Sequence, residues 1–392
     1  MKQVKSPSED ALTEKKPRSR KPWLWAIGLL ILLLLGILLV GILLSRPAGE
    51  PVIPDTPGMA MVAQMGPGLN FSHALECFSE GADGVDSETL WGSPATTREM
   101  LEAVKAAGFT TLRLPVTWSN HLDAQDNVDP AWMDRVQEVV DYAYDLDFFV
   151  ILNAHHEDYY GYVPDKAHEA GVTAQYTKLW AQIAARFRDY GERLLFEAIN
   201  EPRVNGSMLE WGGGTASQRN VINRLHAAFV NTVRESGGNN AGRWLLLPTH
   251  AASREPRVMR ALRLPDDDRL IVSVHLYYPG KFTGTGSPDV TQYTDKDRLD
   301  IDKTLGRIYD CFVKRGVPVY LGEFAAADKH NEAERARYAT DFTAIARRYG
   351  MRCAWWDDAT TAETTITGAA YGLLDRRTLQ WFFPEIAAAL VG

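Results

Sequence analysis

The alternation of short β-branched, apolar runs with longer segments of helical periodicity constrains the fold of this chain more than any other feature. Runs of this length and composition predict strands, and the segments between them predict helices. The strands are expected at residues 66–71, 110–116, 147–154, 193–200, 243–249, 269–277, 317–323 and 351–356. The helices are expected at residues 97–107, 131–145, 174–189, 217–235, 254–263, 298–315, 331–349 and 376–390. This order predicts an α/β fold, a (β/α)8 TIM barrel, rather than a doubly wound sheet.

The size and charge of the chain agree with one large catalytic domain. The chain has 392 residues, 45% of them apolar, which suffices for one barrel of about 250 to 330 residues with an appendage. The formal net charge is −8 in total, but residues 1–22 carry +4, so residues 23–392 carry −12. An acidic body has no means of replacing phosphate counterions, which argues against a nucleic-acid partner.

The three cysteines, Cys77, Cys311 and Cys353, are too few for a disulfide framework. A single disulfide between two of them remains an alternative. We interpret them as small core residues or free thiols.

Residues 23–44 form an uncharged apolar run. As a helix, 22 residues would be about 33 Å long, which is enough to cross the hydrocarbon core of a bilayer. The preceding segment holds five Lys/Arg between positions 15 and 21, whereas Arg46 alone follows closely. The positive-inside rule therefore places the N-terminus in the cytoplasm and the rest of the chain outside.

This reading divides the chain into four parts. Residues 1–22 form a cytoplasmic basic tail, 23–44 a single transmembrane signal anchor, 45–57 a Pro-rich spacer, and 58–392 the barrel. A cleaved signal peptide, which would leave a secreted protein, is the alternative. It is disfavoured because the apolar run exceeds the usual length of about 7 to 15 residues and no clean A-x-A cleavage site follows it.

Polar or aromatic residues end nearly every predicted strand. In a barrel these ends meet on one face, where active sites lie. A single Glu or His in such a place is more often structural, so the array as a whole carries the prediction. Its members are Arg113, His155, His156, Asn200, Glu201, His275, Tyr277, Glu323 and Trp356.

Two carboxylates, Glu201 after the fourth strand and Glu323 at the end of the seventh, match the needs of glycosidic bond cleavage. One carboxylic acid protonates the leaving oxygen while the other attacks the sugar or activates water. The 11 tryptophans offer faces on which sugar rings could stack. A metal site built from His155, His156 and Glu157 is the rival reading, but adjacent histidines on a strand diverge. We expect no cofactor and no metal.

Strand geometry supports part of this array. His275 and Tyr277 are two residues apart and so point to the same face of a strand. Asn200 and Glu201 are adjacent, so both can serve one site only if the backbone turns there.

Several segments together resemble glycoside hydrolase family 5. They are NEP at 200–202, LGEF at 321–324, His275 with Tyr277, and Arg113 within RLPVTW. ETLWGSPATT (88–97), ILNAHHE (151–157) and NRLHAAFVNTVRESGGNN (223–240) are similar to subfamily 4, largely endoglucanases and xyloglucanases. The similarity covers about residues 64–390.

The resemblance implies a (β/α)8 barrel and assigns roles residue by residue. Glu201 of NEP corresponds to the acid/base and Glu323 of GEF to the nucleophile. Asn200 corresponds to the residue that binds the 2-hydroxyl of the sugar beside the scissile bond. His155 and His275 correspond to site histidines, and Trp356 to the stacking residue of the eighth strand. These roles lead us to expect a raised pKa for Glu201 and an ionised Glu323 near Arg113 and Tyr277.

Two segments depart from the family pattern. Where relatives read close to NLGNTLDA, this chain has NFSHALEC at 70–77, so that Ser72, His73 and Glu76 replace Gly, Asn and Asp. This predicts a reshaped non-reducing side of the cleft. WWDD at 355–358 is a milder change.

The leading hypothesis is a membrane-anchored, retaining, endo-acting hydrolase of β-1,4-glucan. Xyloglucan, mixed-linkage glucan and mannan stay open as substrates. The alternative is an anchored carbohydrate-binding or sensing barrel without catalysis, which the presence of Asn200, Glu201 and Glu323 together argues against. We expect a monomer.

Overall fold

The computed structural model describes residues 27–36, 50–79, 84–157, 162–365 and 368–392. The chain divides into two compact units, Met1–Pro51 and Val52–Gly392. In the first unit, residues 27–36 are helical. They belong to the predicted anchor 23–44, the rest of which lies outside the described residues. Among the residues that the structure describes, no helix has both the length and the apolar character needed to cross a membrane.

The second unit is a closed barrel of parallel strands in sequence order, which confirms the predicted fold. All eight strands lie where the sequence predicts them. They are β1 (Gly68–Phe71), β2 (Thr111–Leu114), β3 (Phe149–Asn153), β4 (Leu194–Glu197), β5 (Leu245–Pro248), β6 (Leu270–His275), β7 (Val319–Phe324) and β8 (Arg352–Asp357). The pairing of β1 with β8 closes the barrel, with Asn70 opposite Trp356.

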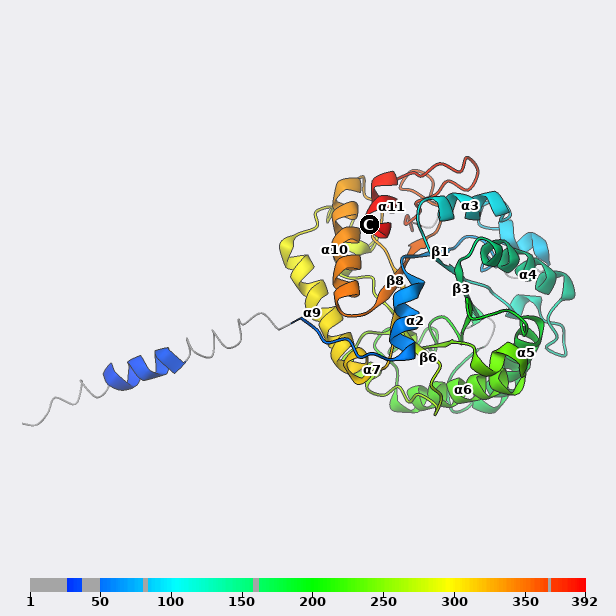
Figure 1. Cartoon of the computed structure of the whole chain (residues 1–392), viewed down its shortest axis with the longest axis horizontal. Coiled ribbons are helices and arrows are strands. Elements are labelled where there is room, and N and C mark those ends of the chain that lie inside the picture. Colours follow the sequence, from blue (N-terminus) through cyan, green and yellow to red (C-terminus); the bar gives the residue numbers. More distant parts are fainter. Residues whose placement is uncertain (1–26, 37–49, 80–83, 158–161, 366–367) are drawn as a thin grey trace, which may run out of the picture. The chain divides into compact units, whose positions relative to one another are not determined.

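Helices surround the strands (Figure 1). They are α2 (Pro57–Met65), α3 (Arg98–Ala106), α4 (Pro130–Asp145), α5 (Glu169–Arg186), α6 (Ala216–Glu235), α7 (Pro256–Met259), α8 (Gly280–Thr283), α9 (Asp295–Cys311), α10 (Glu332–Arg348) and α11 (Pro384–Val391). Several begin at a side-chain cap, which satisfies backbone N–H groups of the first turn. Thr215 caps α6 and Thr294 caps α9, each in a capping box.

Two predicted helices are wrong in extent. The helix expected over 254–263 is the single turn α7, Pro256–Met259. The helix expected over 376–390 begins only at Pro384, because proline fits the first turn of a helix but not its interior. Before it, Leu379 has φ +59° and Leu374 bridges to Trp381, so this stretch is irregular.

Helix α2 was not predicted, and it closes one end of the barrel. Thr56 caps it, and Gly66 ends it with φ +66° before Pro67. Met61, Val62 and Met65 pack on inward-facing side chains at the start of the strands. Figure 1 shows α2 in blue across the ring of strands. The carbonyl of Met65 accepts a hydrogen bond from the Thr110 hydroxyl, beside the first residue of β2.

Inward-facing positions change from apolar to polar along the strands. Ile151 is followed two residues later by Asn153 on β3, and Leu195 by Glu197 on β4. All four side chains are buried. Because side chains two apart on a strand share a face, one end of the barrel interior is an apolar plug and the other is polar. The polar end is the one at which the strands finish.

We expect Met65→Ala to destabilise the barrel unit by about 2 to 5 kcal/mol, because it deletes a fully buried side chain from the plug. Denaturant unfolding of the full chain would measure this loss. Gln64→Ala alters an exposed position of the same helix and is expected to change the unfolding free energy little. Equal effects of the two substitutions would contradict the plug role of α2.

Candidate active site

Arg113 is the centre of the polar end of the barrel. It projects from β2 and is fully buried. Its Nε donates to Glu197 Oε2 at 2.6 Å, and its Nη2 donates to Asn200 Oδ1 at 2.8 Å. Its Nη1 donates to Asn70 Oδ1 at 2.8 Å and to Glu323 Oε1 at 2.9 Å. One guanidinium thus links β2 to residues on or just beyond β1, β4 and β7.

Glu197 is a buried site residue that the sequence analysis missed. Besides Arg113, it receives hydrogen bonds from Ser273 Oγ at 2.6 Å and from Asn153 Nδ2 at 3.3 Å. It lies inside the apolar run of β4, where it read as part of the strand body. A charged residue at an inward-facing position of such a run was the signal available, because a buried carboxylate needs a partner.

Glu201 and Asn200 lie just beyond β4, where the backbone bends. This bend lets the two adjacent side chains serve one site, as predicted. Asn200 receives the Arg113 hydrogen bond, whereas Glu201 Oε1 lies 2.8 Å from His275 Nδ1 at the end of β6. Glu201 therefore projects from the fourth strand toward the sixth.

Glu323, at the end of β7, completes a group with Glu201 and His275. His275 Nδ1 lies 3.5 Å from Glu323 Oε2, and Tyr277 Oη donates to that oxygen at 3.0 Å. One ligand-type atom from each of Glu201, His275 and Glu323 lies within 4.8 Å of the others. An oxygen of one carboxylate is thus within 4.8 Å of an oxygen of the other.

The remaining predicted residues form an aromatic wall beside this group. Trp356 on β8 stacks on His155 with ring centroids 5.5 Å apart and an interplanar angle of 19°. His155 also meets His156 edge-on at 4.5 Å, and His156 lies 4.9 Å from Phe78. His155 Nδ1 is 3.1 Å from Asn153 Nδ2. The structure therefore places all nine predicted residues at one end of the barrel.

Glu157, one of the three ligands of the alternative metal site, is engaged in hydrogen bonds to the backbone. Glu157 receives hydrogen bonds from the backbone N–H groups of Trp118, at 2.8 Å, and Ser119, at 3.0 Å. It thus ties the loop after β3 to the loop after β2. The three residues that do converge, Glu201, His275 and Glu323, have the fixed charge of Arg113 beside them.

The pKa directions of the two carboxylates are the reverse of the expected ones. Burial alone would raise the pKa of Glu201, but its hydrogen bond to His275 and the charges of His275, Arg203 and Arg113 lower it. Burial raises the pKa of Glu323 and repulsion from Glu201 adds to this, while His275, Arg113 and Tyr277 offset only part of the rise. Arg113 and Tyr277 do act on Glu323 as expected, but burial outweighs them.

The histidines differ sharply. Burial alone would lower the pKa of His275, but the Glu323 and Glu201 carboxylates raise it above its ordinary value. Burial, with the nearby charge of Arg203, lowers the pKa of His156 to about 3. Burial also lowers the pKa of His155 well below its ordinary value. Of these three histidines, His275 is the one whose neighbours favour the protonated form, and its Nδ1 lies within hydrogen-bond distance of Glu201.

The divergent segment after β1 lines a hollow next to the aromatic wall. Glu76 is buried and accepts hydrogen bonds from the Ser72 hydroxyl and from the His73 backbone N–H. His73 packs edge-on against Trp91 at 5.2 Å. His73 and Trp91 line a hollow of about 570 Å³ together with Ala359, Thr360 and Phe382. Burial, with the charge of Arg376, lowers the pKa of His73 to about 4, so this imidazole is neutral near pH 7.

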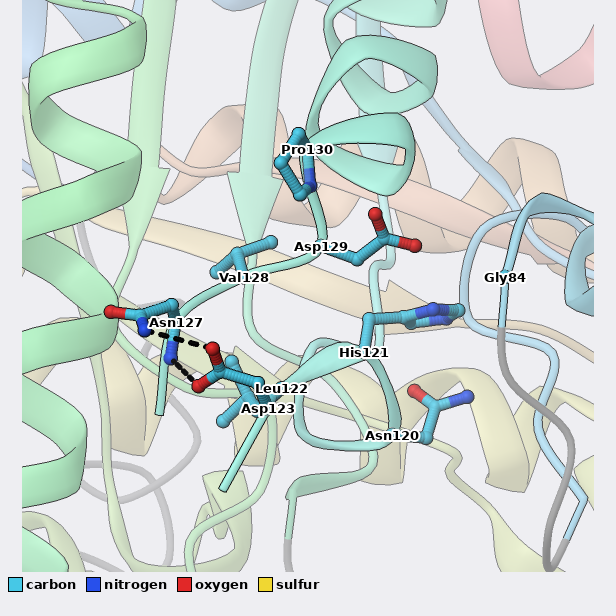
Figure 2. Close-up of a pocket in the computed structure, with 9 residues that line it drawn as sticks. All are labelled: Gly84, Asn120, His121, Leu122, Asp123, Asn127, Val128, Asp129 and Pro130. Carbon is cyan, nitrogen blue, oxygen red and sulfur yellow. Dashed lines mark hydrogen bonds between the residues drawn. The ribbon is translucent and has the colours of Figure 1, made fainter. Parts of the chain in front are cut away.

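A second hollow, of about 600 Å³, lies on the loop between β2 and α4. Figure 2 shows Asp123 accepting hydrogen bonds from the backbone and the side chain of Asn127 in its wall. His121, also in this wall, stacks on Trp132 at 3.8 Å. None of the predicted site residues lines it, so we assign it no part in the site.

We expect the histidines to separate in a titration of the full chain followed by NMR of the imidazole nitrogens. His275 should stay protonated above the usual pH of about 6.5, because two carboxylates stabilise its charged form. His156 should stay neutral down to about pH 3. Single His→Gln variants would assign the signals. Protonation of His156 near pH 6.5 would contradict the burial and the charges described above.

Comparison with known proteins supplies an independent line of evidence. The cellulase family, glycosyl hydrolase family 5, matches residues 76–360. Endoglucanase A of Clostridium longisporum is 40% identical over 337 residues, which cover 84% of this chain and 65% of that protein. The chain therefore spans about two thirds of that relative's length. Endoglucanase A of Ruminococcus albus is 37% identical over 345 residues, with 86% and 93% covered.

A solved structure is similar over the same region. It is a GH5-4 broad specificity endoglucanase from Ruminococcus champanellensis with bound cellotriose, with a TM-score of 0.82 and 38% sequence identity. The similarity covers 87% of this chain and 99% of that one.

Proposed function

Because the chain belongs to glycosyl hydrolase family 5, we propose that it is an endo-acting β-1,4-glucanase that works by a retaining mechanism, with Glu201 as acid/base and Glu323 as nucleophile. The observation that carries the mechanism is the approach of the two carboxylates, whose nearest oxygens lie within 4.8 Å. Retaining enzymes hold their carboxyl groups about 5 to 5.5 Å apart, whereas inverting enzymes leave about 6.5 to 9.5 Å for a water.

The first chemical step forms a covalent intermediate. Glu323 attacks the anomeric carbon while Glu201 gives its proton to the glycosidic oxygen, which leaves with the electron pair of the broken bond. In the second step Glu201, now a carboxylate, takes a proton from water. The resulting hydroxide equivalent attacks the anomeric carbon and releases Glu323, so the product keeps the β configuration.

The lowered pKa of Glu201 and the raised pKa of His275 fit this cycle if the catalytic proton is assigned to the two residues together. In this proposal Glu201 and His275 share one proton across their 2.8 Å hydrogen bond. Transfer of that proton from His275 to Glu201 makes the acid and leaves a neutral imidazole, so no proton has to enter from solvent before glycosylation. Since the two groups interact strongly, their titration belongs to the pair rather than to either residue.

The neighbouring residues have positioning roles in this proposal. Arg113 and Tyr277 hold the two oxygens of Glu323 from different sides, which fixes the direction of attack. Asn200, held by Arg113, keeps its amide available for the sugar 2-hydroxyl, a contact that strengthens in the oxocarbenium-like transition state. Trp356, His155 and His156 form the aromatic wall on which the sugar before the scissile bond lies.

The substrate is a glucan chain that crosses the end of the barrel. The hollow beside His73 lies by β1 and β8, and in a closed barrel these strands are opposite β4 and β5. Glu201 comes from the β4 side, so a glucan chain that reaches the hollow extends past the two carboxylates, which suits cleavage within a chain. The cellotriose bound to the Ruminococcus champanellensis enzyme supports a β-1,4-glucan. Xyloglucan, mixed-linkage glucan and mannan remain alternatives for assay, and we propose that the enzyme acts as a monomer.

We expect chemical rescue to separate the two carboxylates. Glu201→Ala should lose polysaccharide cleavage by several orders of magnitude but still react with an aryl cellobioside whose leaving group needs no proton. Azide should then attack the trapped intermediate, raise turnover and give a β-glycosyl azide. Product configuration by NMR measures this outcome.

The matched variant is Glu323→Ala, which removes the nucleophile. It should be inactive on every substrate whatever the leaving group, because no covalent intermediate can form. A β-glycosyl azide from Glu323→Ala together with an α-glycosyl azide from Glu201→Ala would reverse the assignment. Absence of hydrolysis by the parent chain itself would leave the anchored, non-catalytic carbohydrate-binding barrel as the better explanation.

We also propose that residues 23–44 anchor the enzyme in a membrane, with residues 1–22 in the cytoplasm and the barrel outside. The uncharged run and the Lys/Arg before it support this topology. Within the barrel unit, α2 lies at the end opposite Glu201 and Glu323, since it packs where the strands begin. The chain thus enters the barrel unit at the end away from Glu201 and Glu323.

Protease added to intact spheroplasts should reach the barrel but not residues 1–20. Antibodies against each end of the chain would report the fragments. Recovery of the barrel as a soluble protein that begins near residues 45–50 would instead establish cleavage and secretion.

A further inference from the structure

The loop between β4 and α6 carries an arginine that faces the acid/base carboxylate and that the mechanism above does not use. Arg203 Nη1 donates to the Glu201 backbone carbonyl at 2.9 Å and lies 3.7 Å from Glu201 Oε2. The Arg203 side chain is only 9% exposed. The two oxygens of Glu201 therefore have different partners, with His275 at Oε1 and Arg203 at Oε2.

Two further side chains of the same loop hold the Arg203 guanidinium. Its Nε donates to Glu210 Oε1 at 3.0 Å, and the other oxygen of Glu210 accepts from the Gly206 backbone N–H at 2.9 Å. Its Cζ lies 4.4 Å from the centre of the Trp211 ring. Trp211 is 61% exposed. The guanidinium thus lies between the ring, Glu210 and Glu201, which restricts it far more than an arginine at an exposed surface.

The position of Arg203 relates it to the first half of the reaction, in which the leaving group departs. Glu201 gives its proton to the leaving group, and Trp211 lies on the same loop, so this loop borders the part of the cleft that the leaving group occupies. The opposite side of the cleft holds Trp356 and the hollow by His73. Arg203 is therefore placed to affect departure of the leaving group rather than attack by Glu323.

We propose that Arg203 is a positioning residue that strengthens Glu201 as an acid, so that the enzyme expels poor leaving groups such as the glucosyl units of a polysaccharide. When the Glu201 O–H bond breaks and the proton joins the glycosidic oxygen, a negative charge develops on Glu201 beside the fixed positive charge of Arg203. Arg203 itself gains and loses no proton. This inference rests on the proposed role of Glu201 and adds a group that acts through it.

The two half-reactions respond differently to such a charge. A nearby cation favours the carboxylate form, so it assists proton donation in the first step and makes Glu201 a weaker base in the second. An activated aryl leaving group needs no proton in the first step. Loss of Arg203 should therefore slow cleavage of natural glucans and spare activated substrates, whereas loss of a merely structural contact would slow both.

The experiment compares full-length Arg203→Met with the parent chain on a soluble β-1,4-glucan and on dinitrophenyl β-cellobioside. We expect kcat/KM to fall about tenfold or more on the glucan and less than about threefold on the aryl substrate. The basic limb of the pH profile on the glucan should move upward by about half to one pH unit, because the pKa of Glu201 rises when the cation is removed.

Arg257→Gln is the matched control. Arg257 is exposed and donates to the Gly212 carbonyl of the same loop, so its loss loosens the loop without changing the charge next to Glu201. It should leave the basic limb in place. Arg203→Lys keeps the charge and should restore most of the position of that limb. Should Arg203→Met fail to fold, Arg203→Gln combined with Glu210→Gln removes both members of the ion pair and carries the same expectations.

Equal losses on both substrates with an unmoved basic limb would overturn the inference, as would an Arg203→Lys variant that behaves like Arg203→Met. Failure of azide to rescue Glu201→Ala would instead overturn the proposed function. Rescue of Glu201→Ala together with wild-type behaviour of Arg203→Met would remove only the role of Arg203.

Discussion

The hydrogen bonds of Arg113 are the constraint on which the site depends. A fully buried guanidinium is tolerated only if its charge is balanced and its donors are used. Here the acceptors are Asn70, Glu197, Asn200 and Glu323, on or just beyond three other strands. The closed barrel brings these strands around one point, and the planar fork of arginine reaches all of them at fixed angles. Correct placement of Glu323 and Asn200 is thus coupled to closure of the barrel itself.

The charge balance around Arg113 also explains why His275 lies between the carboxylates. Glu197 and Glu323 together outweigh the single charge of Arg113, and Glu201 adds a third carboxylate within a buried space. A protonated His275 reduces the repulsion between Glu201 and Glu323. In its protonated form His275 can also serve as a proton store for the acid/base, since one hydrogen bond joins it to Glu201.

The sequence predicted every strand and placed all nine candidate residues at one end of the barrel, because strand periodicity and strand ends are local features. What it missed depends on packing between distant segments. Glu197 looks like any strand residue until Ser273 and Arg113 are seen around it. The exposed and buried faces of helix α2 differ little in polarity, and the helix packs against the barrel interior. The expectation that Glu323 has a lower pKa than Glu201 was wrong. It took account of the neighbours of Glu323 but not of its burial, which raises its pKa.

Chemistry and specificity rest on different parts of this barrel. The reacting groups come from β4, β6 and β7, and they are joined by the hydrogen bond of Arg113 to Glu323 and by His275, which lies next to both carboxylates. The hollow by β1 and β8 is lined by His73 and loop residues that make no hydrogen bond to Arg113. Ser72 and Glu76 bond to each other rather than to the reacting groups. Ser72, His73 and Glu76 could therefore diverge from the family pattern, and reshape the donor side of the cleft, without altering the geometry of Glu201 and Glu323, while Asn70 of the same segment keeps its hydrogen bond to Arg113.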